Sequence, residues 1–167
     1  MNYEIRPERP ADARIIREVT EAAFKVARRS AGTEGAIVDA LRAANALTVS
    51  LVATINGEVV GHVAFSPVTI AGADIGWFGL GPVSVRPDVH GRGIGTALIR
   101  EGLERLRKAG ARGCVLLGAP RYYQRFGFGH DPDLRYEEAP PEFFMRLSLD
   151  GSVASGRVAF HAAFSIS

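Results

Sequence analysis

The chain has little of what disulfide-linked, metal-binding and membrane-spanning proteins depend on. Its single cysteine, Cys114, excludes an internal disulfide and a metal site built from several cysteines. The longest apolar run, near residues 46–55, is interrupted by three hydroxyl side chains and is far too short to span a bilayer. The N-terminal residues 1–8 contain no apolar segment of the kind found in secretory signals. These absences favour a cytoplasmic protein with no membrane partner.

An excess of charge of one sign is also missing. The 20 lysines and arginines and 18 acidic residues give a formal net charge of +2, and no run reaches five like charges. Proteins that bind nucleic acid normally concentrate basic residues on one face, so the dispersed charge predicts no nucleic-acid partner. Because the composition is that of an ordinary globular protein, we expect one domain over residues 1–167. Residues from about 150 onward would add a strand or loop.

The N-terminal part predicts a strand and two helices. Residues 3–6 alternate in polarity and stop at a proline, which suits a short strand. Apolar residues at helical spacing follow Asp12, which can cap the first helix, and a second helix is expected to open at Thr33.

Three β-rich segments follow and predict an antiparallel meander. They cover residues 47–55, 59–70 and 75–85. Asn56-Gly57, between the first two, is a strong signal for a two-residue hairpin turn.

The second half of the chain predicts a parallel crossover. A strongly amphipathic helix is expected over residues 94–109, and an apolar strand follows at 114–117. Strand, helix and strand in this order imply a right-handed parallel connection. A short helix at 121–126 and strands near Phe128 and at 143–149 complete a mixed α/β sheet.

Three glycines stand between the third β-rich segment and this helix. Gly91, Gly93 and Gly95 leave backbone N–H groups without side-chain cover at a helix N-terminus. Such a terminus combines unpaired donors with the positive end of the helix dipole and can hold a phosphate. The loop therefore predicts a site for a pyrophosphate-bearing cofactor, with a plain turn that binds nothing as the alternative.

Two better-known phosphate loops do not fit. A P-loop requires Gly-Lys-Ser/Thr, but Thr96 follows Gly95 directly. A dinucleotide fingerprint requires G-x-G-x-x-G after the first strand of a βαβ unit, whereas this G-x-G-x-G follows an antiparallel meander.

Two motifs resemble the GNAT superfamily of N-acetyltransferases. Residues 90–95 (HGRGIG) are similar to its Gln/Arg-x-x-Gly-x-Gly/Ala cofactor loop, and residues 122–128 (YYQRFGF) to its Tyr-x-x-x-Gly-Phe element. With residues 80–85 and the hairpin at 56–61, the pattern looks most like the bacterial YhbS-type subgroup. The resemblance covers roughly residues 3–149.

This resemblance implies an α/β (α+β) GNAT fold. Its sheet would be mixed and mostly antiparallel, with about 6–7 strands flanked by about 4 helices. Acetyl-CoA would be the cosubstrate, with no metal, and would lie between two splayed parallel strands that end at Val85 and Leu117.

The resemblance also implies the residues that hold acetyl-CoA. The pantetheine arm would pair with the backbone of Val83, Ser84 and Val85. The residues expected around the pyrophosphate are His90, Gly91, Arg92, Gly93, Ile94, Gly95 and Thr96. His90 replaces the Gln or Arg usual in the family, and His90 and Arg92 are alternatively solvent-facing turn residues.

Tyr123, four residues before Gly127, matches the family's proton donor. A phenol with a pKa of about 10 stays protonated at neutral pH and can donate to a departing thiolate whose conjugate acid has a pKa of about 8.5. Aromatic packing is its alternative role.

The general base is less well defined, because residues 75–85 and 114–117 contain no carboxylate. His62 is a candidate base, and a water chain or an amine that arrives deprotonated are alternatives. Cys114 is expected to be a core residue. Arg121 and Arg125 are expected either near CoA or an acidic substrate, or in solvent.

The function expected from these residues is direct transfer of an acetyl group to an amine of an unidentified small-molecule or peptide acceptor in a ternary complex. The alternative is a non-catalytic module that binds or senses acyl-CoA. Residues 156–160 could pair with a second subunit and form a homodimer.

Overall fold

The computed structural model describes residues 2–27 and 32–166 and is built around a mixed six-stranded sheet. In spatial order its strands are β1 (Glu4–Pro7), β2 (Val49–Ile55), β3 (Glu58–Pro67), β5 (Trp77–Val85), β6 (Gly113–Leu117) and β8 (Phe144–Ser148). Within this sheet β5 and β6 pair in parallel and the other neighbours are antiparallel. The mixed, mostly antiparallel sheet with a parallel pair is confirmed.

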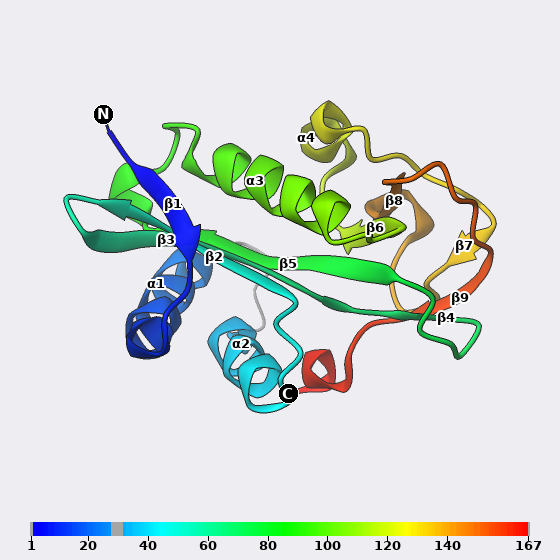
Figure 1. Cartoon of the computed structure of the whole chain (residues 1–167), viewed down its shortest axis with the longest axis horizontal. Coiled ribbons are helices and arrows are strands. Elements are labelled where there is room, and N and C mark those ends of the chain that lie inside the picture. The colour runs from blue at the N-terminus through cyan, green and yellow to red at the C-terminus, as the bar shows by residue number, and fades with distance from the viewer. Residues whose placement is uncertain (1, 28–31, 167) are drawn as a thin grey trace.

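Helices cover both faces of the sheet (Figure 1). The helices are α1 (Ala13–Lys25), α2 (Glu34–Ala43), α3 (Ile94–Lys108) and α4 (Pro120–Tyr123). α1 and α2 lie on one face, and α3 lies on the other against β2, β3 and β5. The four α-helices in residues 2–27 and 32–166 match the expected number, and short 3₁₀ turns (η) occupy Pro10–Asp12, Pro87–Val89, Gln124–Phe126 and Pro141–Phe143.

Asp12 does not cap α1 as its position suggests. Its carboxylate accepts hydrogen bonds from the Arg6 guanidinium at 2.7 and 3.1 Å and from the Arg9 amide at 2.7 Å. The arginine offers a stronger charge-assisted partner than a helix amide, so Asp12 ties β1 to the turn before α1.

The hairpin after β2 forms as predicted, with Asn56 and Gly57 both at positive φ (+51° and +80°). The second β-rich segment, however, divides into β3 and a two-residue strand, β4 (Thr69–Ile70). Phe128 is buried in the core, but its neighbour Gly129 makes only an isolated bridge with Arg146 where a strand was expected.

β5 and β6 separate partway along their length. Their paired residues run from Trp77–Gly113 to Gly79–Val115, while β5 continues to Val85. Pro82 lies in the unpaired half and has no N–H to offer a ladder. The two parallel strands therefore diverge toward the N-terminus of α3.

A second, three-stranded sheet was not expected. It contains β4, β9 (Gly156–Ala159) and β7 (Leu134–Arg135), with β9 in the middle. β4 pairs with residues 158–159 and β7 with residues 156–157, so the tail pairs within its own chain. A homodimer stays a prediction. The turn η5 (Ala162–Ser165) then packs beside α2.

In the part of the chain that the structure describes, no helix is both long enough and apolar enough to cross a membrane. The cytoplasmic location stays a prediction.

Candidate active site

The loop from β5 to α3 is shaped by two glycines in the left-handed region. Gly91 has φ of +77° and Gly93, at the N-cap of α3, has φ of +80°. The first hydrogen bond of the helix runs from the Ala97 amide to the Gly93 carbonyl at 3.0 Å. The amides of residues 94–96 thus precede the helical ladder, and no side chain caps this end of α3.

A cavity of about 570 Å³ opens in front of these amides. It is lined by Val83, Ser84, Val85, Val89, His90, Gly91, Gly93, Ile94, Gly95, Thr96, Ile99, Tyr122 and Arg125. The structure thus brings nine of the ten residues expected around acetyl-CoA to one cavity. The tenth, Arg92, is exposed and lies outside this lining.

The backbone of β5 presents polar groups to this cavity. The Arg86 amide donates to the Val60 carbonyl of β3 at 2.7 Å. Because backbone groups alternate in direction along a strand, those of Val85 and Val83 point to the other side, where β6 has diverged. His90 supports this orientation, since its Nε2–H donates to the Val85 carbonyl at 2.6 Å. His90 therefore fastens the glycine loop to the end of β5.

Tyr122 and Tyr123 take different places. Tyr122 lines the cavity, and its hydroxyl lies 2.9 Å from Thr96 Oγ1 at the start of α3. Arg125 stacks on the Tyr122 ring, 4.3 Å from its centroid, and also lines the cavity. Of the two arginines that the sequence left open, this one reaches the site. The motif spacing had singled out Tyr123 and not this residue.

Tyr123 lies behind this wall, beside the end of β6. Its ring covers Gly118, where an added Cβ would overlap it, and contacts the ring of Phe128 edge-on at 6.2 Å between centroids. Burial raises the pKa of Tyr123 to about 12. The phenol therefore keeps its proton at any physiological pH.

On the opposite face of the sheet, His62 belongs to a buried polar chain. Its Nε2 lies 2.8 Å from Ser50 Oγ, and the Ser50 hydroxyl contacts the Glu8 carboxylate. Glu8 in turn accepts two hydrogen bonds from Arg42, at 2.9 and 3.0 Å. Burial would raise the pKa of Glu8, but its bonds to Arg42 and Ser50 outweigh this, and the pKa falls below its ordinary value.

The hydrogen bonds fix the tautomer of His62. An ionised Glu8 can only accept, so the Ser50 hydroxyl donates to it and must accept from His62 Nε2–H. Nδ1 is then the unprotonated ring nitrogen, and it is buried without a hydrogen-bond partner. Burial is the main cause that lowers the pKa of His62 to about 4, so the ring is neutral at pH 7.

Ser84 connects the face that carries His62 with the cavity. It pairs with His62 across β3 and β5 and also lines the cavity. The Thr20 hydroxyl donates to the Ile16 carbonyl at 2.7 Å, so the Ser84 hydroxyl donates to Thr20 Oγ1 at 3.3 Å. The lone pairs of Ser84 are left as acceptors, as is Nδ1 of His62.

Glu8 and Ser50 were missed by the sequence analysis. They lie 54 and 12 residues from His62 in the chain, and no motif joins them. The one local signal was a carboxylate that directly follows the first strand at Pro7.

Cys114 is fully buried, and burial raises the pKa of its thiol, which agrees with a core role. Among residues 2–27 and 32–166, no group of three or more histidines, cysteines or acidic residues could hold a metal ion.

Comparisons with known proteins agree with this geometry. Residues 4–130 match the family described as the acetyltransferase (GNAT) domain. The uncharacterized N-acetyltransferase YhbS of Escherichia coli (strain K12) is 35% identical, over 96% of this chain and 97% of that protein.

Two solved structures are similar along nearly the whole chain. One is a GNAT family acetyltransferase from Brucella melitensis in complex with acetyl-CoA, with 57% identity, a TM-score of 0.88 and 98% coverage of both chains. The other is Escherichia coli YhbS in complex with CoA, with 34% identity, a TM-score of 0.90 and coverage of 99% of this chain and 93% of that one.

Proposed function

The chain belongs to the acetyltransferase (GNAT) family, and we propose that it transfers the acetyl group of acetyl-CoA directly to an acceptor amine while both are bound. The observation that carries this proposal is the cavity between the diverging β5 and β6, which begins at the uncapped N-terminus of α3. The relatives of known structure hold acetyl-CoA or CoA.

The residues around the cavity fit the chemical groups of CoA. A Cβ built on Gly91 or Gly93 would meet no protein atom within 4 Å, so the loop leaves room for diphosphate oxygens to approach its amides. The backbone groups of Val83 and the amide of Val85 can pair with the pantetheine amides as an added strand would, while His90 holds the Val85 carbonyl. When bound, acetyl-CoA supplies the acetyl group as a reactive thioester.

Tyr123 is the proton donor in this proposal. Its pKa of about 12 keeps the phenol protonated, so it can donate a hydrogen bond that stabilises the thiolate as the C–S bond breaks. Complete proton transfer to the thiolate, whose conjugate acid has a pKa of about 8.5, is uphill, so the role of Tyr123 is to stabilise the leaving group by this donation. Tyr123 lies beside the end of β6, where the strands diverge, whereas Tyr122 is held by Thr96 at the phosphate end. Tyr122 is therefore assigned to binding.

We assign His62 as the base that takes the proton of the acceptor amine. Its unpartnered Nδ1 lone pair can accept a proton, and because its pKa is about 4 the ring is a weak base that would hold the proton only transiently. Because His62 is fully buried and the Ser84 hydroxyl donates to Thr20, the proton must travel by way of a water. Ser50 and ionised Glu8 would stabilise the imidazolium from the other side of the ring.

Calorimetric titration with CoA tests the cofactor site, with Gly93→Ala and Gly72→Ala as a matched pair. Both glycines have φ of +80° and no protein atom within 4 Å of a built Cβ, so both substitutions place a side chain at the same unfavourable φ. Gly72 lies in a turn after β4, outside the cavity lining. We expect Gly93→Ala alone to weaken CoA binding, by about tenfold or more. Equal affinity in the two variants contradicts the assigned phosphate site.

Turnover separates the enzyme from the acyl-CoA sensor. We expect CoA release from acetyl-CoA in the presence of a panel of primary amines, with acetylated products identified by mass spectrometry. Tyr123→Phe should lower kcat by about 10²-fold or more and leave CoA affinity unchanged, whereas Tyr122→Phe should mainly weaken CoA binding. Stabilisation by acetyl-CoA without turnover on any amine would favour the sensor.

A further inference from the structure

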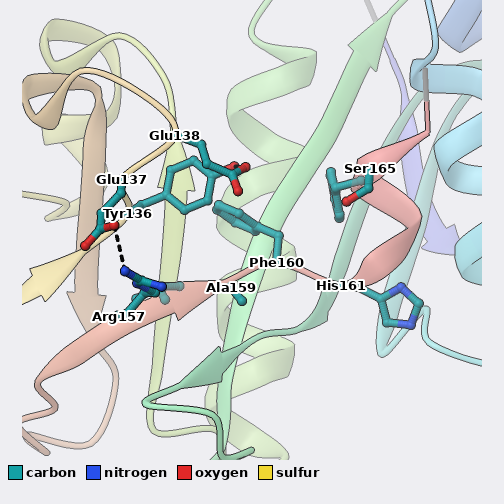
Figure 2. A pocket seen from close by; sticks show the side chains of 10 residues that line it. Tyr136, Glu137, Glu138, Arg157, Ala159, Phe160, His161 and Ser165 are labelled. Carbon is teal, nitrogen blue, oxygen red and sulfur yellow. Dashed lines mark hydrogen bonds and ion pairs between the residues drawn. The ribbon is translucent and has the colours of Figure 1, made fainter.

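A second cavity, of about 410 Å³, lies between the segment that follows β7 and the C-terminal tail (Figure 2). We call it the aromatic groove. It is lined by Tyr136, Glu137, Glu138, Arg157, Val158, Ala159, Phe160, His161, Phe164 and Ser165. Its volume is within the range of about 300–1,000 Å³ common for small-molecule sites.

Three aromatic rings in contact form one wall of the groove. Tyr136 and Phe160 meet edge-to-face at 5.1 Å between centroids, and Phe160 and Phe164 follow at 5.6 Å. Their side chains are half-buried, so each ring both packs and remains accessible. The faces of aromatic rings attract cations through the ring quadrupole.

The groove also contains a carboxylate that no cation neutralises. Glu137 is paired with Arg157 at 2.7 Å, whereas Glu138 accepts a hydrogen bond from the Tyr136 hydroxyl at 3.0 Å. Within the described residues, no lysine, arginine or histidine pairs with Glu138. Figure 2 shows its carboxylate on the same side of the groove as the Tyr136 and Phe160 rings.

The groove adjoins the point where β5 and β6 separate. A Cβ added to Gly79 would lie 2.9 Å from Cδ1 of Phe160, so the Phe160 ring rests directly on that residue. Gly79 is the last β5 residue paired with β6, and the cavity for acetyl-CoA opens beyond it. Leu80, the next residue, packs in the core under α3, so Gly79 and Phe160 belong to the other face of the sheet.

We propose that the aromatic groove is the acceptor site and that it selects an organic ammonium ion, held by the Glu138 carboxylate and the faces of Tyr136, Phe160 and Phe164. This assignment rests on the acetyl transfer proposed above. An amine that enters along the groove arrives at the divergence of β5 and β6 from the face opposite α3. The groove would thus discriminate against neutral and anionic compounds of the same shape.

Three probes of similar shape and different charge test this selection: 2-phenylethylamine, 2-phenylethanol and phenylacetate. Their affinities are measured by calorimetry, with and without saturating CoA. We expect the amine to bind most tightly and phenylacetate least. Glu138→Gln should weaken amine binding by about tenfold and leave the alcohol unchanged, since one charge-assisted contact is lost. Glu142→Gln, an exposed glutamate in the turn before β8 and outside the groove, is the matched control.

Equal affinity for the three probes, binding of none of them, or an amine affinity that Glu138→Gln does not change would each overturn the assignment. Steady-state kinetics then separate this assignment from the proposed function. Glu138→Gln should raise KM for 2-phenylethylamine about tenfold with little change in kcat. If the protein acetylates amines but Glu138→Gln leaves KM for the amine unchanged, the acceptor-site assignment is refuted and the proposed function is not. Absence of both CoA binding and transfer refutes the function, while the charge preference of the groove is still measured without CoA.

Discussion

Neutral His62 gives the sharpest prediction, because its titration couples to folding. In the folded protein burial lowers the pKa of His62 to about 4, whereas an exposed histidine in the unfolded chain has a pKa of about 6.5. The folded pKa is the lower of the two, so acid favours the unfolded state. The stability contributed by neutral His62 is fully present above pH 6.5 and is lost as the pH falls toward 4.

The size of this loss follows from the two pKa values. At pH 5 the unfolded state has bound nearly one proton at this position and the folded state almost none, so folding is weaker by about 2 kcal/mol than at pH 7. The loss is about 3 kcal/mol at pH 4 and is complete only below that pH. Glu8 affects stability over a different pH range. Its pKa is lowered in the folded state, so its contribution to folding stability is lost only as the pH falls below the ordinary carboxylate range.

Urea unfolding at several pH values between 7 and 5 measures this effect. The comparison is with His62→Gln, which keeps an amide donor for Ser50 but cannot titrate. The other three histidines are common to both proteins. The difference between their free energies of unfolding, plotted against pH, therefore isolates His62. We expect that difference to change by about 2 kcal/mol across this range. Parallel curves would refute the buried, neutral state of His62 and the base role assigned to it.

Two further predictions concern glycines under aromatic rings. Gly118→Ala would push the Tyr123 ring away from the end of β6, and we expect kcat to fall at least tenfold with CoA affinity retained, measured by steady-state kinetics and calorimetry. A loss of CoA affinity equal to the loss of kcat would contradict it. Gly102→Ala would overlap the fully buried Phe65 ring, and we expect a loss of about 1–3 kcal/mol in urea unfolding, although alanine favours a helix. Gly95 lies in the same helix as Gly102, and a Cβ there would meet only Val85 of β5 at an ordinary contact distance. Gly95→Ala is therefore the control for stability and should not destabilise the fold.

Much of the candidate site was predictable because its signals are local. The positive φ angles of Gly91 and Gly93 require residues without a Cβ, and the amphipathic helix begins directly after them. The Asn56-Gly57 turn likewise depends on the backbone freedom of two adjacent residues. A phosphate-binding helix terminus and a meander can therefore be recognised from short, contiguous patterns.

Spacing alone could not decide which tyrosine faces the cavity. The motif singles out Tyr123, yet Tyr122 forms the cavity wall because α4 is short and places the two rings on different sides, against Thr96 and Gly118 respectively. Which neighbour each ring meets is decided by where β6 ends relative to α3.

The sequence by itself determined the glycine-rich start of α3, the parallel crossover from β5 to β6 and the hairpin at Asn56, since each is encoded within one continuous segment. Tertiary structure alone decided the rest. The chain Glu8–Ser50–His62 joins the residue after β1 to β2 and β3. Burial lowers the pKa of His62, bonds to Arg42 and Ser50 lower that of Glu8, and no local pattern reveals either. The small sheet of β4, β7 and β9 unites segments too short to show periodicity, and only their packing creates the aromatic groove.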